Sequence, residues 1–388
     1  MFFLLCVTIY LAGLAIFQRL WVARARRAPE RSPDVAVLLA ATSMAMLGLC
    51  VLCSVGMIMS GQLLPGILRT ISFIIYHVTV IGPLFLVTVL AALLWRSRRT
   101  PQRPLLCWSP SLLIWCALVF GASAIGLWST QVEPYWLDLH HVEPVQLHAT
   151  SPLSEELQIA ILADLQHDTI TTFQHHIVEA TMQERPNLIL IPGDLYDSHA
   201  AEAHIDDFRA LLSKLSAPLG VFMVVGDHDR LEVLGEMTRG TQVVLLDDRR
   251  TQIELDEQHA LEVVGLSSSE REAFDLAMAR PPLEQDARPD VHLSRIVLVH
   301  RPRHVLYLRE EDDVSLVVAG HTHGGQINVP FFGPPVTISP LPRDVAAGGL
   351  HQLPHTRLYI SRGLGGVQQG VPLIRFNCRP ELPILHLR

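Results

Sequence analysis

The chain has 388 residues, 49% of them hydrophobic, and a formal net charge of −8. Its charge is unevenly distributed: residues 1–130 carry ten arginines and no lysine against two acidic residues, a balance of +8, which leaves −16 on residues 131–388. The acidic second part argues against nucleic acid as a partner, because surfaces that bind nucleic acid are basic.

Residues 1–130 contain four long and nearly uncharged stretches, at 2–18, 35–60, 71–95 and 111–129. About 20 apolar residues in a helix can cross a bilayer, and these stretches lack the polar stripe of a helix packed on a globular core. We therefore predict three parts of the chain: a transmembrane region of about four helices over 1–130, a linker over 131–154, and a folded domain over 155–388.

The arginines of the first part predict its orientation. They concentrate between the first two stretches and after the third, whereas the loop between the second and third holds only Arg69. Because arginine-rich loops stay in the cytoplasm, we expect a multi-pass inner-membrane protein whose folded domain lies on the extracytoplasmic side.

From about residue 157, short apolar runs alternate with helical patterns, which predicts an α/β fold. Five runs end in Asp or His, and ligands of open α/β sheets bind at the carboxyl ends of strands. The runs are LQIAILAD, NLILIPGD, GVFMVVGDHD, SRIVLVH and VSLVVAGHTH. Their polar ends predict that the side chains converge on one site.

Aspartate and histidine without cysteine suit a divalent metal such as Mn²⁺, Fe²⁺, Zn²⁺ or Mg²⁺. The donors are too many for one ion and suit two. A pair of metal ions about 3.5–4 Å apart can generate a hydroxide and clamp a phosphoryl oxygen during in-line displacement.

The order of these blocks, D-x-(H), GD, G(N)HD, H and GHTHGGQ, resembles that of the calcineurin-like metallophosphoesterase superfamily over roughly residues 155–388. The tail YISRGLGGVQQGVPLIRFNCRPEL and the apolar first part are most similar to the bacterial membrane-anchored group. The resemblance implies a four-layer αββα sandwich, here preceded by about four transmembrane helices. It also implies the metal ligands: Asp164 and His323 on one ion, Asp194 bridging both, and His300 and His321 on the other.

Two catalytic roles and two departures follow from the same comparison. The resemblance implies that His228 contacts the phosphate and protonates the leaving oxygen, while Asp229 orients that imidazole. Where the family has a His in the first block this chain has Gln166, and where it has an Asn in the third block this chain has Asp227. We keep both as predicted ligands, because amide and carboxylate oxygens bind cations. An alternative is a register change that makes His167 the ligand in place of Gln166.

The shift toward oxygen ligands favours Mn²⁺, with Mg²⁺, Fe²⁺ or Zn²⁺ as alternatives. We predict a membrane-anchored, two-metal phosphoesterase that hydrolyses phosphomonoesters or phosphodiesters by in-line attack of a metal-bridging hydroxide. Four spans suggest a lipid-linked substrate. Two other functions stay open: a pyrophosphohydrolase of UDP-diacylglucosamine type in lipid A synthesis, and a non-catalytic membrane binding or sensing protein with a degenerate site.

Overall fold

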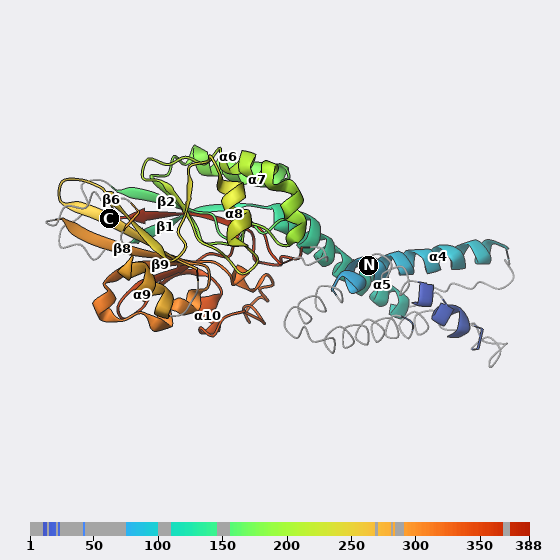
Figure 1. Ribbon diagram of the computed structural model, residues 1–388. Helices are drawn as coiled ribbons and strands as arrows, with labels where there is room; N and C mark the ends of the chain where they lie inside the picture. The colour runs from blue at the N-terminus through green and yellow to red at the C-terminus, as the bar shows by residue number, and fades with distance from the viewer. Residues whose placement is uncertain are drawn as a thin grey trace. The chain divides into compact units, whose positions relative to one another are not determined.

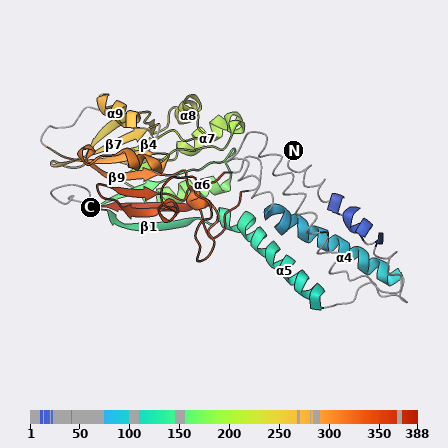
Figure 2. The same ribbon diagram turned by 90° about the horizontal axis from the view of Figure 1, so that it is seen from below.

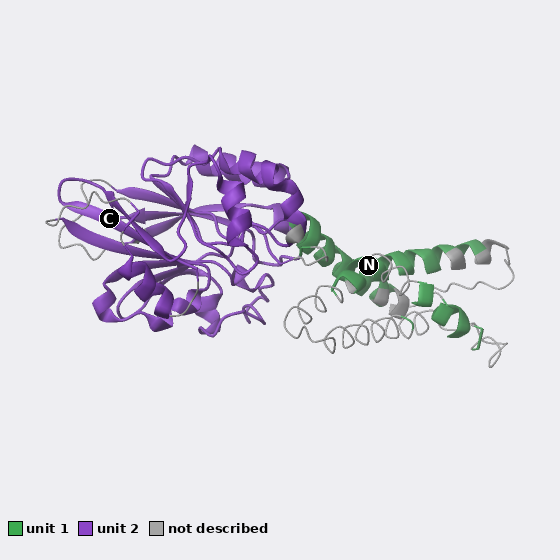
Figure 3. Ribbon diagram, in the orientation of Figure 1, with its two compact units in different colours: residues 1–132, 368–373 green, residues 133–367, 374–388 purple. Residues whose placement is uncertain are grey.

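The computed structural model describes most of the chain after residue 74. The described residues are 11–13, 15–20, 22–23, 42, 75–99, 110–145, 156–267, 271–280, 282–283, 291–367 and 373–388. The chain divides into two compact units, residues 1–132 with 368–373 and residues 133–367 with 374–388 (Figure 3). All the predicted metal ligands belong to the second unit.

The first unit is helical where it is described. Its longer elements are the π-helix η1 (His77–Ile81), α4 (Gly82–Arg99), α5 (Pro110–Leu127) and the π-helix η2 (Trp128–Val132). None of the described helices combines the length and the apolar character that crossing a membrane requires. The predicted bundle of about four transmembrane helices is therefore wrong, and so is the predicted multi-pass inner-membrane location.

Helix length gives the physical reason. The last four residues of α4 are Arg-Ser-Arg-Arg, so its uncharged part extends about 21 Å at 1.5 Å per residue. Helix α5 has 18 residues and extends about 27 Å, at the lower end of what a hydrocarbon core about 30 Å thick requires. The predicted spans 2–18 and 35–60 lie largely outside the described residues.

The second unit contains two six-stranded sheets. The first has the order β1-β12-β2-β3-β4-β5, and all its neighbours run parallel except β12 and β2. Its strands are β1 (Asp138–Val145), β12 (Glu381–Leu387), β2 (Leu157–Ile161), β3 (Leu188–Ile191), β4 (Val221–Met223) and β5 (Val243–Leu245). Strand β1 lies in the segment 131–154, which the sequence led us to treat as a linker.

The second sheet has the order β10-β11-β9-β8-β7-β6 and is parallel in its centre, with an antiparallel strand at each edge. Its strands are β10 (Gly349–Gln352), β11 (Arg357–Ile360), β9 (Val314–Ala319), β8 (His292–Val299), β7 (His259–Leu266) and β6 (Arg249–Glu254). Central strands such as β9 are buried along their whole length, which explains their continuous apolar sequences.

Helices cover the outer faces of both sheets (Figures 1 and 2). The helices α6 (Thr172–Gln183), α7 (Ile205–Leu212) and α8 (Leu231–Thr238) share a buried core with the first sheet. The helices α9 (Arg271–Ala279) and α10 (Arg343–Ala346) share another with the second sheet. A third core, which includes Ile161 and Leu190 from one sheet and Val263 and Leu298 from the other, fills the space between the sheets.

These three cores separate four layers, helix, sheet, sheet and helix, and this part of the architecture agrees with the sandwich that the family resemblance implies. Short 3₁₀ turns complete the unit. They are η3 (Glu133–Tyr135), η4 (His199–His204), η5 (Pro302–Tyr307), η6 (Glu310–Asp312) and η7 (His323–Gly325). The layered core fixes the strand ends on which the candidate site is built.

Candidate metal centre

The predicted ligands follow strands that run parallel within their sheets. In the first sheet, Asp164, Asp194 and Asp227 come three or four residues after the ends of β2, β3 and β4. In the second sheet, His300 directly follows β8, and His321 comes two residues after β9. Because parallel strands end at the same edge of a sheet, these loops meet at one edge of the sandwich.

Two glycines let the loops approach closely. A Cβ atom on Gly226 would lie 2.2 Å from both the backbone nitrogen and Oδ1 of Asp194, and one on Gly320 would lie 2.6 Å from Oδ2 of Asp164. Such distances are far below van der Waals contact, so a side chain at either position would displace the neighbouring carboxylate. These glycines therefore set the positions of Asp164 and Asp194.

Asp164, Asp194 and His300 form the first donor group, in which one ligand atom from each residue lies within 4.8 Å of the others. Oδ2 of Asp194 lies 3.3 Å from Nε2 of His300, and Oδ1 of Asp164 lies 3.8 Å from Nδ1 of the same ring. Nδ1 of His300 donates to the Pro192 carbonyl at 2.9 Å. In the neutral ring this contact leaves the lone pair on Nε2, which faces the carboxylate of Asp194.

Asp227, His300 and His321 form the second donor group, under the same distance limit. Oδ2 of Asp227 lies 2.9 Å from Nδ1 of His321 and 3.7 Å from Nε2 of His300. The two imidazoles meet edge to face, with centroids 5.0 Å apart. Both donor groups include His300, and together they supply three carboxylates and two imidazoles, which suffice for two neighbouring cations.

Burial and mutual charge make this region attractive to positive charge. Burial raises the pKa of Asp164 to about 7. Burial also opposes ionisation of Asp194, yet the neighbouring His300 lowers the pKa of this carboxyl to about 2. Burial disfavours the imidazolium of His300, but the carboxylates of Asp194 and Asp164 raise its pKa to about 10. Clustered carboxylates that hold an imidazole in its charged form also suit a divalent cation.

Two further predicted ligands test whether the site fits a metal. Gln166 is fully buried and its Nε2 donates to Oδ2 of Asp194 at 3.3 Å, while its Oε1 has no hydrogen-bond partner among the described residues. His323 is also buried, and the structure gives its Nδ1 no partner in the described part of the chain. Burial lowers the pKa of His323 well below its usual value, so the ring is neutral.

A buried acceptor without a partner is costly, and a bound cation would satisfy both atoms. The residues present therefore fit a metal. His167 belongs to neither donor group, and the charges that influence its ring are those of Asp168 and Asp197. These observations favour Gln166 over His167 as the ligand.

The carboxylate of Asp229 lies against backbone amides. Its Oδ1 accepts from the backbone nitrogen of Leu195 and its Oδ2 from that of Gly226, both at 2.9 Å. The His228 ring is held elsewhere, because its Nδ1 donates to the carbonyl of Asp197 at 2.7 Å. The backbone nitrogen of His228 also donates to Oδ1 of Asp194 at 2.8 Å. Asp229 thus stabilises the loops, and the carbonyl of Asp197 orients the imidazole.

Two arginines lie close to the donor groups, and sequence reasoning missed the first of them. Arg301 directly follows the ligand His300 and pairs with Asp227; its position after a predicted ligand was the available signal. Arg375 is completely buried, and its guanidinium donates to the carbonyls of Arg362, Gly363, Gly365 and Cys378. The amide of Gly365 in turn donates to the carbonyl of Asp164 at 2.6 Å. Arg375 therefore supports the loop that contacts Asp164 of the first donor group.

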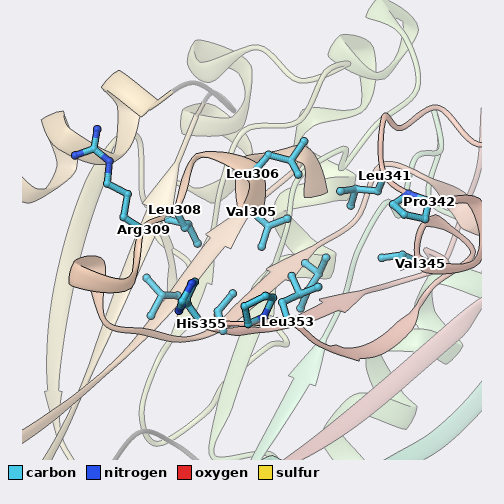
Figure 4. A pocket seen from close by; sticks show the side chains of 13 residues that line it. Val305, Leu306, Leu308, Arg309, Leu341, Pro342, Val345, Leu353 and His355 are labelled. Atoms are coloured by element: carbon cyan, nitrogen blue, oxygen red, sulfur yellow. The ribbon is translucent and has the colours of Figure 1, made fainter.

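A separate apolar pocket of about 270 Å³ lies among η5, α10 and the segment before β11. Figure 4 shows Val305 and Leu306 on one side of it and Leu341, Val345 and Leu353 around the rest. None of the predicted metal ligands lines it. The pocket is therefore distinct from the metal centre.

Comparison with known proteins agrees with this geometry. The family model described as calcineurin-like phosphoesterase matches residues 157–325. The chain is 32% identical over 212 residues to the uncharacterized metallophosphoesterase YkuE of Bacillus subtilis (strain 168), an alignment that covers 53% of this chain and 69% of YkuE. It is 28% identical over 265 residues to the phosphodiesterase YaeI of Escherichia coli (strain K12), covering 66% of this chain and 90% of YaeI.

Among solved structures, YfcE, a phosphoesterase from E. coli, matches with 13% identity and a TM-score of 0.26, covering 56% of this chain and 85% of that chain. That score is too low to carry an argument. The identity to YkuE over 69% of its length, together with the family model, shows that the chain belongs to the calcineurin-like metallophosphoesterase family. It is a metal-dependent phosphoric ester hydrolase.

Proposed function

We propose that this protein hydrolyses phosphodiesters with two bound divalent metal ions, and that phosphomonoesters are the second substrate class. The observation that carries the proposal is the pair of adjacent donor groups, which bring three carboxylates and two imidazoles together. The relative named phosphodiesterase YaeI supports the diester class.

The residues that would hold the ions are those of the two donor groups together with Gln166 and His323. Three carboxylates and an amide among seven ligands favour Mn²⁺ or Mg²⁺ over Zn²⁺. When bound, two such ions activate water and stabilise the charge of the transferring phosphoryl group.

The remaining steps fall to His228. Its Nδ1 donates to the carbonyl of Asp197, so Nε2 is the ring atom that exchanges a proton with the leaving oxygen. The bond from its backbone nitrogen to Oδ1 of Asp194 ties this imidazole to the donor group that positions the phosphorus. A general acid placed in this way contributes about 10²- to 10⁴-fold to the rate.

A lipid-linked substrate is not part of this proposal. The sequence suggested such a substrate because of the four predicted spans. No described helix meets the requirements for crossing a membrane. A UDP-diacylglucosamine-type substrate has no specific observation among the described residues in its favour.

The test is turnover of bis-p-nitrophenyl phosphate by the full chain with added Mn²⁺. We expect the variant Asp194→Asn to lose both bound manganese and activity, and His228→Asn to keep manganese while its kcat falls at least about 100-fold. The matched controls are Asp207→Asn, whose carboxylate is 64% exposed, and His355→Asn, whose ring is also exposed; both should behave like the wild type. Full turnover in the presence of a chelator, or in Asp194→Asn, would refute the proposal.

A further inference from the structure

Asp227 stands where the family pattern has an asparagine, and it forms an ion pair with Arg301. Nε of Arg301 donates to Oδ1 and Oδ2 of Asp227 at 2.8 and 3.0 Å, and Nη2 lies 2.7 Å from Oδ1. Two nitrogens of one guanidinium thus bind one carboxylate, the geometry that makes such pairs strong. The side chain of Asp227 is 28% exposed and that of Arg301 is 43% exposed, so the pair lies at the open side of the site.

The same carboxylate is a member of the second donor group. Its Oδ2 lies 2.9 Å from Nδ1 of His321, while Oδ1 makes the shortest contact with Arg301. Oδ2 of Asp227 therefore contacts both His321 and Nε of Arg301, whereas Oδ1 faces the guanidinium. Because Arg301 follows His300 in the chain, its guanidinium is held close to the imidazoles of the second donor group.

An aspartate in place of an asparagine adds one negative charge beside the second cation position. Such a charge a few ångströms away binds a metal more tightly, and it also repels an incoming phosphoryl anion. The guanidinium of Arg301 opposes both effects. At the effective dielectric of a partly exposed site, one charge at this range changes an equilibrium constant by roughly tenfold or more.

We propose that Asp227 and Arg301 act as one charge-compensated unit, in which Arg301 offsets the tighter metal binding and the weaker phosphoryl-anion binding that the carboxylate alone would cause at the second position. The inference rests on the proposed function, since it assumes a metal at the second donor group. Arg301 acts through Asp227 and is a positioning residue, because its effect on the substrate requires the carboxylate.

The experiment is a double-mutant cycle on the full chain, which separates coupled from independent effects. For Arg301→Gln, Asp227→Asn and the double variant, Mn²⁺ affinity is measured by calorimetry, and inorganic phosphate affinity is measured in manganese-saturated protein. We expect Arg301→Gln to bind Mn²⁺ about tenfold more tightly and phosphate about tenfold more weakly.

Asp227→Asn should change both affinities in the opposite directions. The double variant should return both to within about threefold of the wild type, and Arg301→Lys, which keeps the charge, should stay close to the wild type. Arg309→Gln is the matched control: this arginine is exposed and its ion pair with Glu311 measures 3.5 Å, so its loss should shift neither affinity.

Other outcomes overturn the inference in recognisable ways. If Arg301→Gln weakens phosphate binding, leaves Mn²⁺ affinity unchanged and is not rescued by Asp227→Asn, Arg301 contacts the phosphate directly. If both affinities fall together with the thermal stability, the pair is structural. If the wild type binds no Mn²⁺, the proposed function fails and this inference fails with it. If the wild type binds Mn²⁺ but the variants do not show opposite changes in Mn²⁺ and phosphate affinity, this inference alone is wrong.

Discussion

Gly226 determines whether the loop after β4 can lie against Asp194. Its amide donates to Asp229, and an added Cβ would overlap the backbone nitrogen and Oδ1 of Asp194 at 2.2 Å. We expect Gly226→Ala to displace the carboxylate of Asp194 and to reduce Mn²⁺ affinity and diesterase activity at least about tenfold, by forcing backbone against backbone. Calorimetric titration with Mn²⁺ and initial rates measure these effects.

Gly235 supplies the matched control for that substitution. It lies in α8, and a Cβ added to it would meet nothing within 4 Å. Alanine is favoured over glycine in a helix by about 0.5–1 kcal/mol, so Gly235→Ala should raise stability slightly and leave metal affinity unchanged. Wild-type manganese binding in Gly226→Ala would mean that the close approach to Asp194 is not required.

The sequence identified site residues more readily than their directions. Asp164, Asp194 and His300 could be predicted because each follows an apolar run, and ligands gather where parallel strands end. Their geometry could not, because Asp164 and Asp194 adopt φ values of 49° and 52°, a region that residues other than glycine seldom occupy. The turn after each strand therefore decides where a side chain points. For the same reason, the sequence did not predict that the carboxylate of Asp229 accepts from the backbone amides of Leu195 and Gly226.

At the level of elements, Glu262 joins three strands of the second sheet. It is fully buried on β7, and it accepts from Arg250 on β6 and from Arg295 on β8, each at 2.5 Å. Burial alone would raise the pKa of Glu262, but the two arginines lower it below its ordinary value of 4.5. The carboxylate is thus more stable as an anion in the folded protein than in the unfolded chain.

We expect Glu262→Gln to lower the free energy of unfolding by about 3 kcal/mol or more at pH 7, because it leaves two largely buried arginines without their counter-ion. A folded pKa below the unfolded one adds stability above pH 4.5 and loses it as pH falls through the folded pKa. The stability difference between wild type and variant should therefore shrink below about pH 4.5, as measured by urea unfolding. Glu311→Gln, at a carboxylate that is 69% exposed, should cost under about 0.5 kcal/mol, and an equal loss in both variants would contradict the argument.

Elements with continuous apolar sequences could be predicted, and those that depend on distant partners could not. Strands β3 and β9 appear in the sequence as uninterrupted apolar runs, because both of their faces are buried. Strand β1 has the polar sequence DLHHVEPV and forms by pairing with β12, from Asp138 with Glu381 to Val145 with Leu387. In the first 130 residues, apolar composition predicted membrane spans, but none of the helices in the described part meets the requirements for crossing a membrane.

At the scale of the whole second unit, the metal centre connects the two sheets. Asp164, Asp194 and Asp227 follow strands of the first sheet, whereas His300 and His321 follow strands of the second. The strand ends bring together three carboxylates: Asp227 pairs with Arg301, while Asp164 and Asp194 share the single ring of His300. Their mutual repulsion opposes the packing of the loops unless positive charge is bound.

Metal binding should therefore stabilise this unit as a whole. A ligand that binds only the folded state at 100 times its dissociation constant adds about 2.7 kcal/mol, so saturating Mn²⁺ should raise the midpoint of thermal unfolding by several degrees, and a chelator should reverse the rise. Differential scanning calorimetry of the full chain measures both. Asp194→Asn should lose the response because it removes the carboxylate that contacts His300 in the first donor group, while Asp207→Asn should keep it. An equal rise in Asp194→Asn would show that manganese stabilises the protein from another site, and that the strand ends converge for a different purpose.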